Sequence, residues 1–158
     1  MNQYITKEPI DIFQYWKDVH DSETGAVVVF SGEIRGTGKG KQVAWLEYES
    51  YESMAEKVIG DIVARANEKW PLNKVVCLHR IGRLEITDCA ILVITCSAHR
   101  DAAYKANRYI VDEVKHMAPI WKNEIFTDGT HAWGANCEGC EHSYHQNPDI
   151  QHHHRHSH

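Results

Sequence analysis

Residues 90–119 read AILVITCSAHRDAAYKANRYIVDEVKHMAP and carry the clearest structural pattern in the chain. The first part, 90–96, is apolar and rich in β-branched residues, which is typical of a strand. After 97–101, apolar side chains recur every three or four residues, so we predict a helix that Pro119 ends. A strand therefore leads directly into a helix. One face of the predicted helix carries Ala103, Ala106, Ile110, Val114 and Met117.

Four further segments are strand-like because they are short and rich in β-branched or aromatic residues. We expect the first two to form a hairpin around a long, mobile loop at 32–40, which contains four glycines. We expect the last two to pair with 90–96 in one sheet. The four segments are 26–30, 43–48, 74–80 and 83–86.

Two other segments have helical spacing. The stretch from Pro9 to Val19 predicts a short amphipathic helix with proline in its first turn. Apolar residues from Ala55 to Ala66 predict a longer helix that stops before Pro71. Helices packed on a mainly antiparallel sheet form an α+β architecture.

The composition fits one globular domain. The chain has 158 residues, 42% of them hydrophobic, and a formal net charge of −5, which argues against a general nucleic-acid or membrane-surface binder. No apolar run reaches the roughly 18 residues that cross a bilayer, and five cysteines, an odd number, fit a reducing compartment. We expect a cytoplasmic protein with a folded domain over 1–135 and a Cys/His-rich tail over 136–158.

The tail contains groups that bind metals. Cys137 and Cys140 form a Cys-x-x-Cys pair, and His142 and His145 follow before a terminal histidine run. Such a pair is half of a zinc site that histidines can complete. The same residues also fit an adventitious metal binder or a tail without fixed structure. We expect no metal in the active site itself.

The junction at His99 and Arg100 is a candidate anion site. A helix N-terminus presents unpaired N–H groups and the positive end of the helix dipole. Arg100 adds a guanidinium fork that suits phosphate. Asp101 would stabilise the same helix end without any ligand, so the residues alone leave both interpretations open.

Three further cations are candidates for the same site. Lys115 lies on the last helical turn and Lys122 follows the break at Pro119, so the chain can fold back and bring the two amines together. Lysines near other cations suit nucleophilic or acid/base work, although a lone lysine often only complements the helix dipole. Arg35 lies in the glycine loop, which is either a simple connection or a lid over an anion.

Several motifs occur in one order over residues 25–133. They are FSGEIR (30–35), LEYESY (46–51) leading to MA (54–55), HRIG (79–82), SAHR (97–100), Lys115, PIWKNE (119–124), Gly129 and Trp133. Together they resemble the large, catalytic subunit of the molybdopterin synthase family. The resemblance implies an α+β fold of the α/β-hammerhead-like type.

The resemblance also implies a sulfurtransferase of molybdenum cofactor biosynthesis. Enzymes of this family convert cyclic pyranopterin monophosphate into molybdopterin by installing two sulfurs as a dithiolene. The sulfur arrives as a thiocarboxylate on the C-terminal Gly-Gly of a small ubiquitin-like subunit. The assembly is a heterotetramer around a central dimer of large subunits, and no cofactor is required because the partner supplies the sulfur.

By position, the resemblance assigns catalysis to Lys115 and Lys122, with Lys115 as acid/base or electrostatic catalyst at the thiocarboxylate. It assigns the binding of the substrate's phosphate and pterin to Arg35, His99 and Arg100. The expected substrate-binding set is Glu33, Ile34, Arg35, His99, Arg100, Lys115, Lys122, Asn123 and Glu124.

Two other functions stay open on the sequence. One is a non-catalytic module that binds a ubiquitin-like partner and a metal through its Cys/His tail. The other is a general pterin- or nucleotide-binding protein that needs no partner.

Overall fold

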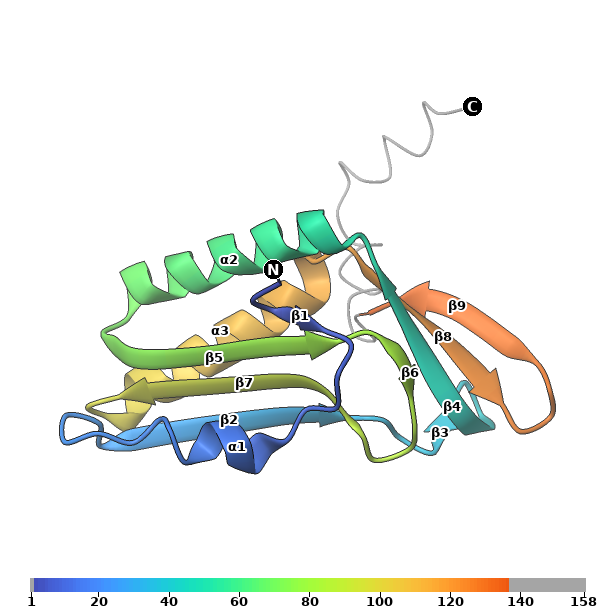
Figure 1. Ribbon diagram of the computed structural model, residues 1–158, viewed down its shortest axis with the longest axis horizontal. Coiled ribbons are helices and arrows are strands. Elements are labelled where there is room, and N and C mark those ends of the chain that lie inside the picture. Colours follow the sequence, from blue (N-terminus) through green and yellow to red (C-terminus); the bar gives the residue numbers. More distant parts are fainter. Residues whose placement is uncertain (1, 137–158) are drawn as a thin grey trace.

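The computed structural model describes residues 2–136, which form two sheets and three helices (Figure 1). The first sheet has the strand order β1-β5-β7-β2. Its pairs are antiparallel except for β1 and β5, which run parallel. The bounds are β1 (Ile5–Thr6), β2 (Ala26–Glu33), β5 (Leu72–Arg80) and β7 (Cys89–Ser97).

Strand β7 is the buried centre of this sheet and confirms the strand predicted at 90–96. All of its residues from 90 to 97 are buried, because strands flank both edges and side chains cover both faces. Ile91 and Val93 join the core beneath the helices, whereas Leu92 and Ile94 face the opposite side.

The second sheet lies at one end of the molecule, to the right in Figure 1, and has the order β3-β4-β8-β9. Strand β6 pairs with β4 off this path. All of its described pairs are antiparallel. The bounds are β3 (Thr37–Gly38), β4 (Lys41–Ser50), β6 (Gly82–Leu84), β8 (Ile120–Phe126) and β9 (His131–Ala135).

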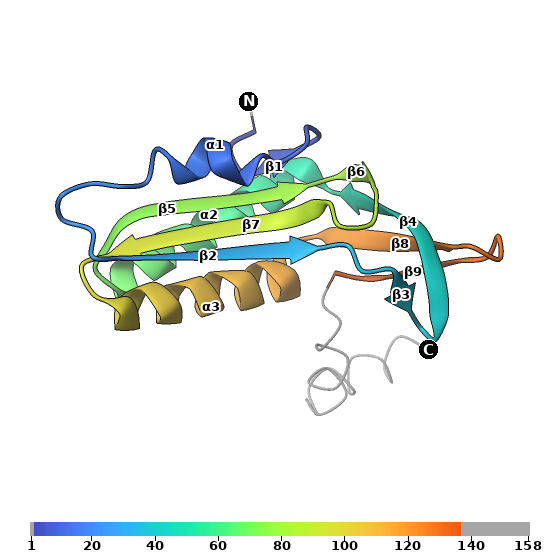
Figure 2. The same cartoon turned by 90° about the horizontal axis from the view of Figure 1, so that it is seen from below.

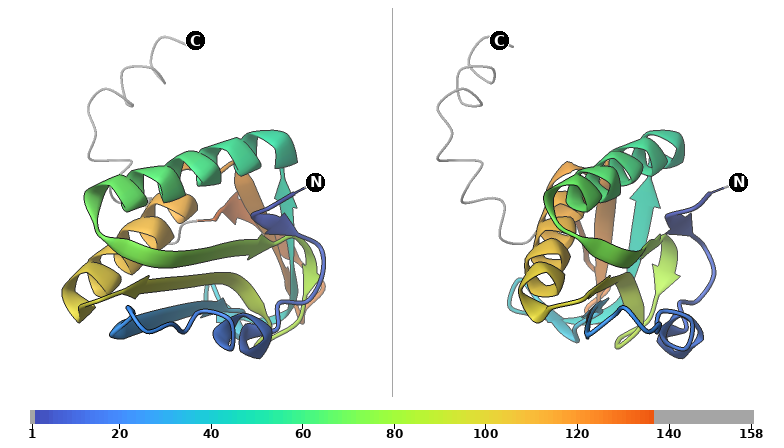
Figure 3. Two further views of the ribbon diagram at one scale, coloured as in Figure 1. Left: turned by 60° about the vertical axis from the view of Figure 1, so that its left-hand side comes forward. Right: turned by 90° about the vertical axis from the view of Figure 1, so that its left-hand side faces the viewer.

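Helices α2 (Glu52–Lys69) and α3 (Arg100–Met117) confirm the two long helices predicted from sequence. They cover one face of the first sheet, and α1 (Ile12–Trp16) lies on the other (Figures 2 and 3). The α+β fold with mainly antiparallel sheets is therefore confirmed. Among residues 2–136, no helix is long and apolar enough to cross a membrane.

The predicted hairpin between 26–30 and 43–48 is wrong. Strand β2 pairs with β7 in the first sheet, and β4 pairs with β8 in the second. The missed partner is β8, whose central residues Lys122, Asn123 and Glu124 are polar and do not read as a buried strand. The chain therefore passes from one sheet to the other where the sequence suggested one continuous pair.

The expectation that 74–80, 83–86 and 90–96 share one sheet is correct only for β5 and β7. Strand β6 pairs with β4 instead. The physical reason is the turn at Gly82, whose φ of 93° is a left-handed conformation that favours glycine. This turn directs the chain away from β5 toward the second sheet.

The first helix is shorter than the stretch from Pro9 to Val19. It begins after Asp11, whose carboxylate accepts a hydrogen bond from the backbone N–H of Phe13 at 3.1 Å, and it ends at Trp16. Pro9 therefore lies outside the helix, while Val19 is buried against β7 residues.

Candidate functional site

A cavity of about 150 Å³ lies where the C-terminal end of α3 meets the second sheet. Side chains from the end of β2, from β3 and β4, from α3 and from β8 line it, together with the residue that follows β9. The lining residues are Glu33, Ile34, Arg35, Thr37, Leu46, Tyr48, Lys115, Lys122, Glu124 and Asn136.

Both candidate lysines line this cavity. Lys115 is half-buried in the last turn of α3, and Lys122 is only 8% exposed in β8. Pro119 ends the helix, and the chain returns at once as β8. The fold-back expected from sequence therefore brings the two amines to one place.

The strand end that carries Arg35 is held by the loop before β7. The backbone N–H of Ile34 donates to the carbonyl of Asp88 at 3.1 Å, and the N–H of Thr87 donates to the carbonyl of Ile34 at 2.9 Å. Both backbone polar groups of Ile34 are thus hydrogen-bonded to this loop. Its neighbours Glu33 and Arg35 are carried to the cavity on a fixed backbone.

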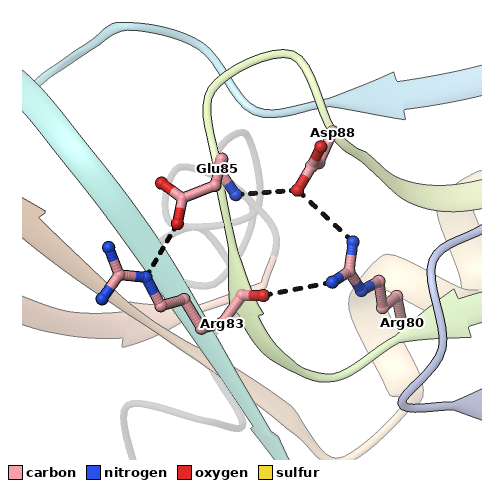
Figure 4. Close-up of polar contacts among 4 residues, drawn as sticks. All are labelled: Arg80, Arg83, Glu85 and Asp88. Atoms are coloured by element: carbon pink, nitrogen blue, oxygen red, sulfur yellow. Dashed lines mark hydrogen bonds and ion pairs between the residues drawn. The ribbon is translucent and has the colours of Figure 1, made fainter.

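That loop is itself cross-linked by charged side chains (Figure 4). The carboxylate of Asp88 accepts hydrogen bonds from the backbone N–H of Glu85 at 2.9 Å and from the guanidinium of Arg80 at 3.3 Å. Arg80 also donates to the carbonyl of Arg83, whose guanidinium pairs with Glu85 at 2.8 Å. These bonds cross-link the loop whose backbone groups at Thr87 and Asp88 hold Ile34 beside the cavity.

The glycine segment forms a short hairpin where a long, mobile loop was expected. Strands β3 and β4 pair across a two-residue turn at Lys39 and Gly40, whose φ angles of 51° and 75° are both left-handed. Gly38 packs against the carboxylate of Glu124, and a side chain at position 38 would collide with it. Glu124 is only 6% exposed and lines the cavity.

His79 was not predicted as a site residue, although it lies in the HRIG motif. Its ring is fully buried and forms a T-shaped pair with the ring of Tyr48, with ring centroids 4.9 Å apart. Burial, reinforced by the charge of Lys115, lowers the pKa of His79 to about 4. Its Nε2 lies 3.0 Å from the side-chain amide nitrogen of Asn136. Asn136 is the first residue of the tail predicted from the sequence. No local sequence pattern predicts the contact of His79 with Tyr48 or with Asn136, because each joins segments that are distant in sequence.

Two predicted residues lie at the other end of α3. His99 is the N-cap and Arg100 the first residue of the helix, and both are exposed. Arg100 and Lys115 are fifteen residues apart, which is about 22 Å along a helix. One copy of the chain therefore does not bring His99 and Arg100 to the cavity.

Asn123 is also absent from the cavity lining, because neighbouring residues in a strand point to opposite faces. Its side-chain oxygen lies 3.2 Å from Nδ1 of His131. Among residues 2–136, no group of three His, Cys, Asp or Glu side chains could hold a metal ion. The metal ligands proposed for the tail, Cys137, Cys140, His142 and His145, lie outside the described residues.

The arrangement suits an anionic ligand. Arg35, Lys115 and Lys122 bring three cationic groups to one small cavity, in a chain whose net charge is negative. Two carboxylates, Glu33 and Glu124, line the same space and moderate the charge. Cationic donors around a partly desolvated cavity bind phosphate and stabilise negative charge that develops during a reaction.

Known proteins are similar to this chain in both sequence and fold. The sequence model of the family described as "MoaE protein" matches residues 5–117. The "Molybdopterin synthase catalytic subunit" of Staphylococcus aureus (strain COL) is 44% identical over 140 residues, which are 88% of this chain and 94% of that protein.

Two solved structures have folds similar to that of this chain. The crystal structure of molybdopterin synthase from Staphylococcus aureus matches with a TM-score of 0.78 and 43% identity, covering 85% of this chain and 98% of that one. A complex of subunits 1 and 2 of molybdopterin-converting factor from Helicobacter pylori matches with a TM-score of 0.69, covering 83% of this chain and 88% of that one. At 19% identity, this second match shows the shared fold alone.

Proposed function

This chain belongs to the MoaE family, and from that premise we propose that it is the catalytic subunit of a molybdopterin synthase. In this proposal it transfers sulfur from the thiocarboxylated C-terminus of a small ubiquitin-like subunit to cyclic pyranopterin monophosphate. The observation that carries the proposal is the convergence of Arg35, Lys115 and Lys122 on one cavity. No metal or organic cofactor takes part, because the partner protein supplies the sulfur.

The cavity residues divide the work by their position. Arg35 and Lys122 hold the phosphate-bearing pterin, since both are cationic and line the same space. Lys115 contacts the thiocarboxylate and stabilises the negative charge that develops as sulfur attacks the substrate. Half-burial at the helix end strengthens that interaction, because a charge acts more strongly where water is excluded.

A second copy of the chain would complete this site. Strand β2 is at the edge of its sheet, and the apolar run Ala26–Phe30 has no strand on its outer side among the described residues. A groove of about 430 Å³ lies beside it between β2 and α3, where Val28, Phe30 and Val111 are part of the lining. An uncharged, half-buried edge strand is a ready template for pairing with another chain.

The orientation of α3 means that such a dimer would bring residues from both ends of this helix to one site. Helix α3 runs in the same direction as β2 beneath the sheet (Figure 2). If two β2 edges pair antiparallel about a twofold axis, the two α3 helices also run antiparallel. The N-terminus of one helix, with His99 and Arg100, then lies toward the Lys115 end of the other. This arrangement would unite the predicted phosphate-binding residues that a single chain separates.

Reconstitution with a thiocarboxylated small subunit and cyclic pyranopterin monophosphate tests the proposal. We expect dithiolene product from the wild-type chain and a loss of roughly 100-fold or more in rate for Lys115→Ala, as for removal of an electrostatic catalyst. Lys105→Ala is the matched control, since Lys105 lies on the same helix but is exposed and paired with Asp101. A wild-type chain without product, or Lys115→Ala with the full rate, would refute the assignment.

A further inference from the structure

Asn136 is a buried amide with one satisfied end and one unsatisfied end. It directly follows β9 and is 4% exposed. Its amide nitrogen lies 3.0 Å from Nε2 of His79, whereas its Oδ1 is buried and has no hydrogen-bond partner within residues 2–136. A buried carbonyl without a donor is costly and calls for an explanation, such as a ligand that supplies the donor.

The orientation of this amide follows from the ring beside it. Nδ1 of His79 is 2.8 Å from the carbonyl oxygen of Arg80, which can only accept, so Nδ1 carries the proton. The buried ring is neutral near pH 7 because burial lowers its pKa to about 4, so Nε2 is a bare acceptor. Only the NH₂ group of Asn136 can face such an acceptor. Oδ1 is therefore held away from His79 by a relay that starts at the backbone of β5.

The cavity supplies the place where this oxygen could act. Asn136 lines the same space as Arg35, Lys115 and Lys122. Those three groups can only donate hydrogen bonds, which suits a phosphate but not the N–H groups of a heterocycle, and the carboxylates Glu33 and Glu124 accept hydrogen bonds but carry negative charge. A neutral carbonyl accepts from an N–H without requiring a buried charge. It therefore complements the ring part of a substrate where the cations complement its phosphate.

We propose that Asn136 is a substrate-contacting residue whose Oδ1 accepts a hydrogen bond from a ring N–H of the pterin, and that His79 positions its amide. The inference rests on the proposed function, because it takes cyclic pyranopterin monophosphate as the ligand of this cavity. It assigns recognition of the ring to Asn136 and leaves recognition of the phosphate to the cations.

Calorimetric titration with two probes, cyclic pyranopterin monophosphate and inorganic phosphate, tests the assignment. Two variants remove the acceptor in different ways: Asn136→Leu nearly preserves the volume, and Asn136→Ala leaves a gap. We expect both to weaken pterin binding roughly 3- to 10-fold, the range for one lost hydrogen bond. The affinity for inorganic phosphate should stay within about twofold of the wild type, because no phosphate contact is removed.

Asn67→Ala is the matched control, since Asn67 is an exposed asparagine whose amide bonds only within α2. Thermal melts of all variants establish that they are folded. His79→Phe keeps a buried ring but removes the acceptor that orients the amide, so it should raise KM for the pterin several-fold while changing kcat little. A merely structural role would lower kcat and phosphate affinity as well.

Three results would overturn the inference: unchanged pterin affinity in both variants, a loss in only one of them, or an equal loss for phosphate. A wild-type chain that binds phosphate but not the pterin would instead refute the proposed function. The two failures are therefore read from different arms of the same experiment.

Discussion

Mixing two impaired variants tests whether the catalytic site spans two copies of the chain. The variants are Lys115→Ala, at the C-terminal end of α3, and Arg100→Ala, at its N-terminal end. About 22 Å of helix separates the two positions within one chain, too far for both side chains to contact one small substrate. Alone, each variant should be impaired: Arg100→Ala by roughly 10- to 100-fold, the cost of a charged hydrogen bond to phosphate, and Lys115→Ala by at least as much.

The magnitude in the mixture follows from twofold symmetry. If each site takes Lys115 from one chain and Arg100 from the other, a mixed dimer has one doubly impaired site and one intact site. Random assortment makes about half of the dimers mixed, so about one quarter of the wild-type activity should return. If both residues served a site in one chain, every site in the mixture would carry one defect, and no activity would return.

The assay is dithiolene formation after co-expression, or after unfolding and joint refolding, with thiocarboxylated small subunit in excess. Lys115→Ala mixed with Lys122→Ala is the matched control, because both side chains line one cavity within one chain and no intact site can form. Activity that stays at the level of the single variants in the first mixture would refute the dimer arrangement. Recovery in the control mixture would refute the assignment of the two lysines to one cavity.

Three further predictions concern residues outside the cavity lining, namely His79, Asp88 and Cys77. Because burial holds the pKa of His79 at about 4 in the folded chain, below the 6.5 of an exposed histidine, the unfolded chain binds more protons between these values. The free energy of unfolding should therefore fall by up to about 3 kcal/mol from pH 6.5 to 4, and denaturant titrations of His79→Phe should lack that contribution. Asp88→Ala removes the acceptor for Glu85 and Arg80. It should lower the free energy of unfolding by about 1–3 kcal/mol and raise KM, and an unchanged KM would argue against a role in holding the cavity wall. Burial raises the pKa of the Cys77 thiol to about 12, so iodoacetamide at pH 8 should label Cys77 only in denaturant, as read by mass spectrometry.

The helices and the central strand were predictable because their patterns are local. Prolines at 71 and 119 mark the ends of α2 and α3, and the apolar run of β7 reads as a strand without reference to any neighbour. Strand β8 was not predictable in this way. Lys122 and Glu124 are polar and line the cavity. The residues that form the site therefore interrupt the apolar pattern by which a buried strand is recognised in a sequence.

Some features of the candidate site were likewise predictable from the sequence, and others were not. The sequence alone shows the charges of Arg35, Lys115 and Lys122. It also shows the break at Pro119 that lets the chain fold back. The placement of Arg100 at the far end of α3, and the burial of His79 beside Asn136, come from packing between strands that are distant in sequence. Local periodicity specifies which face of an element is buried, because it depends on backbone geometry alone. Which buried faces meet is settled only when the whole chain packs, and the relay from Arg80 through His79 to Asn136 exists only in that packed state.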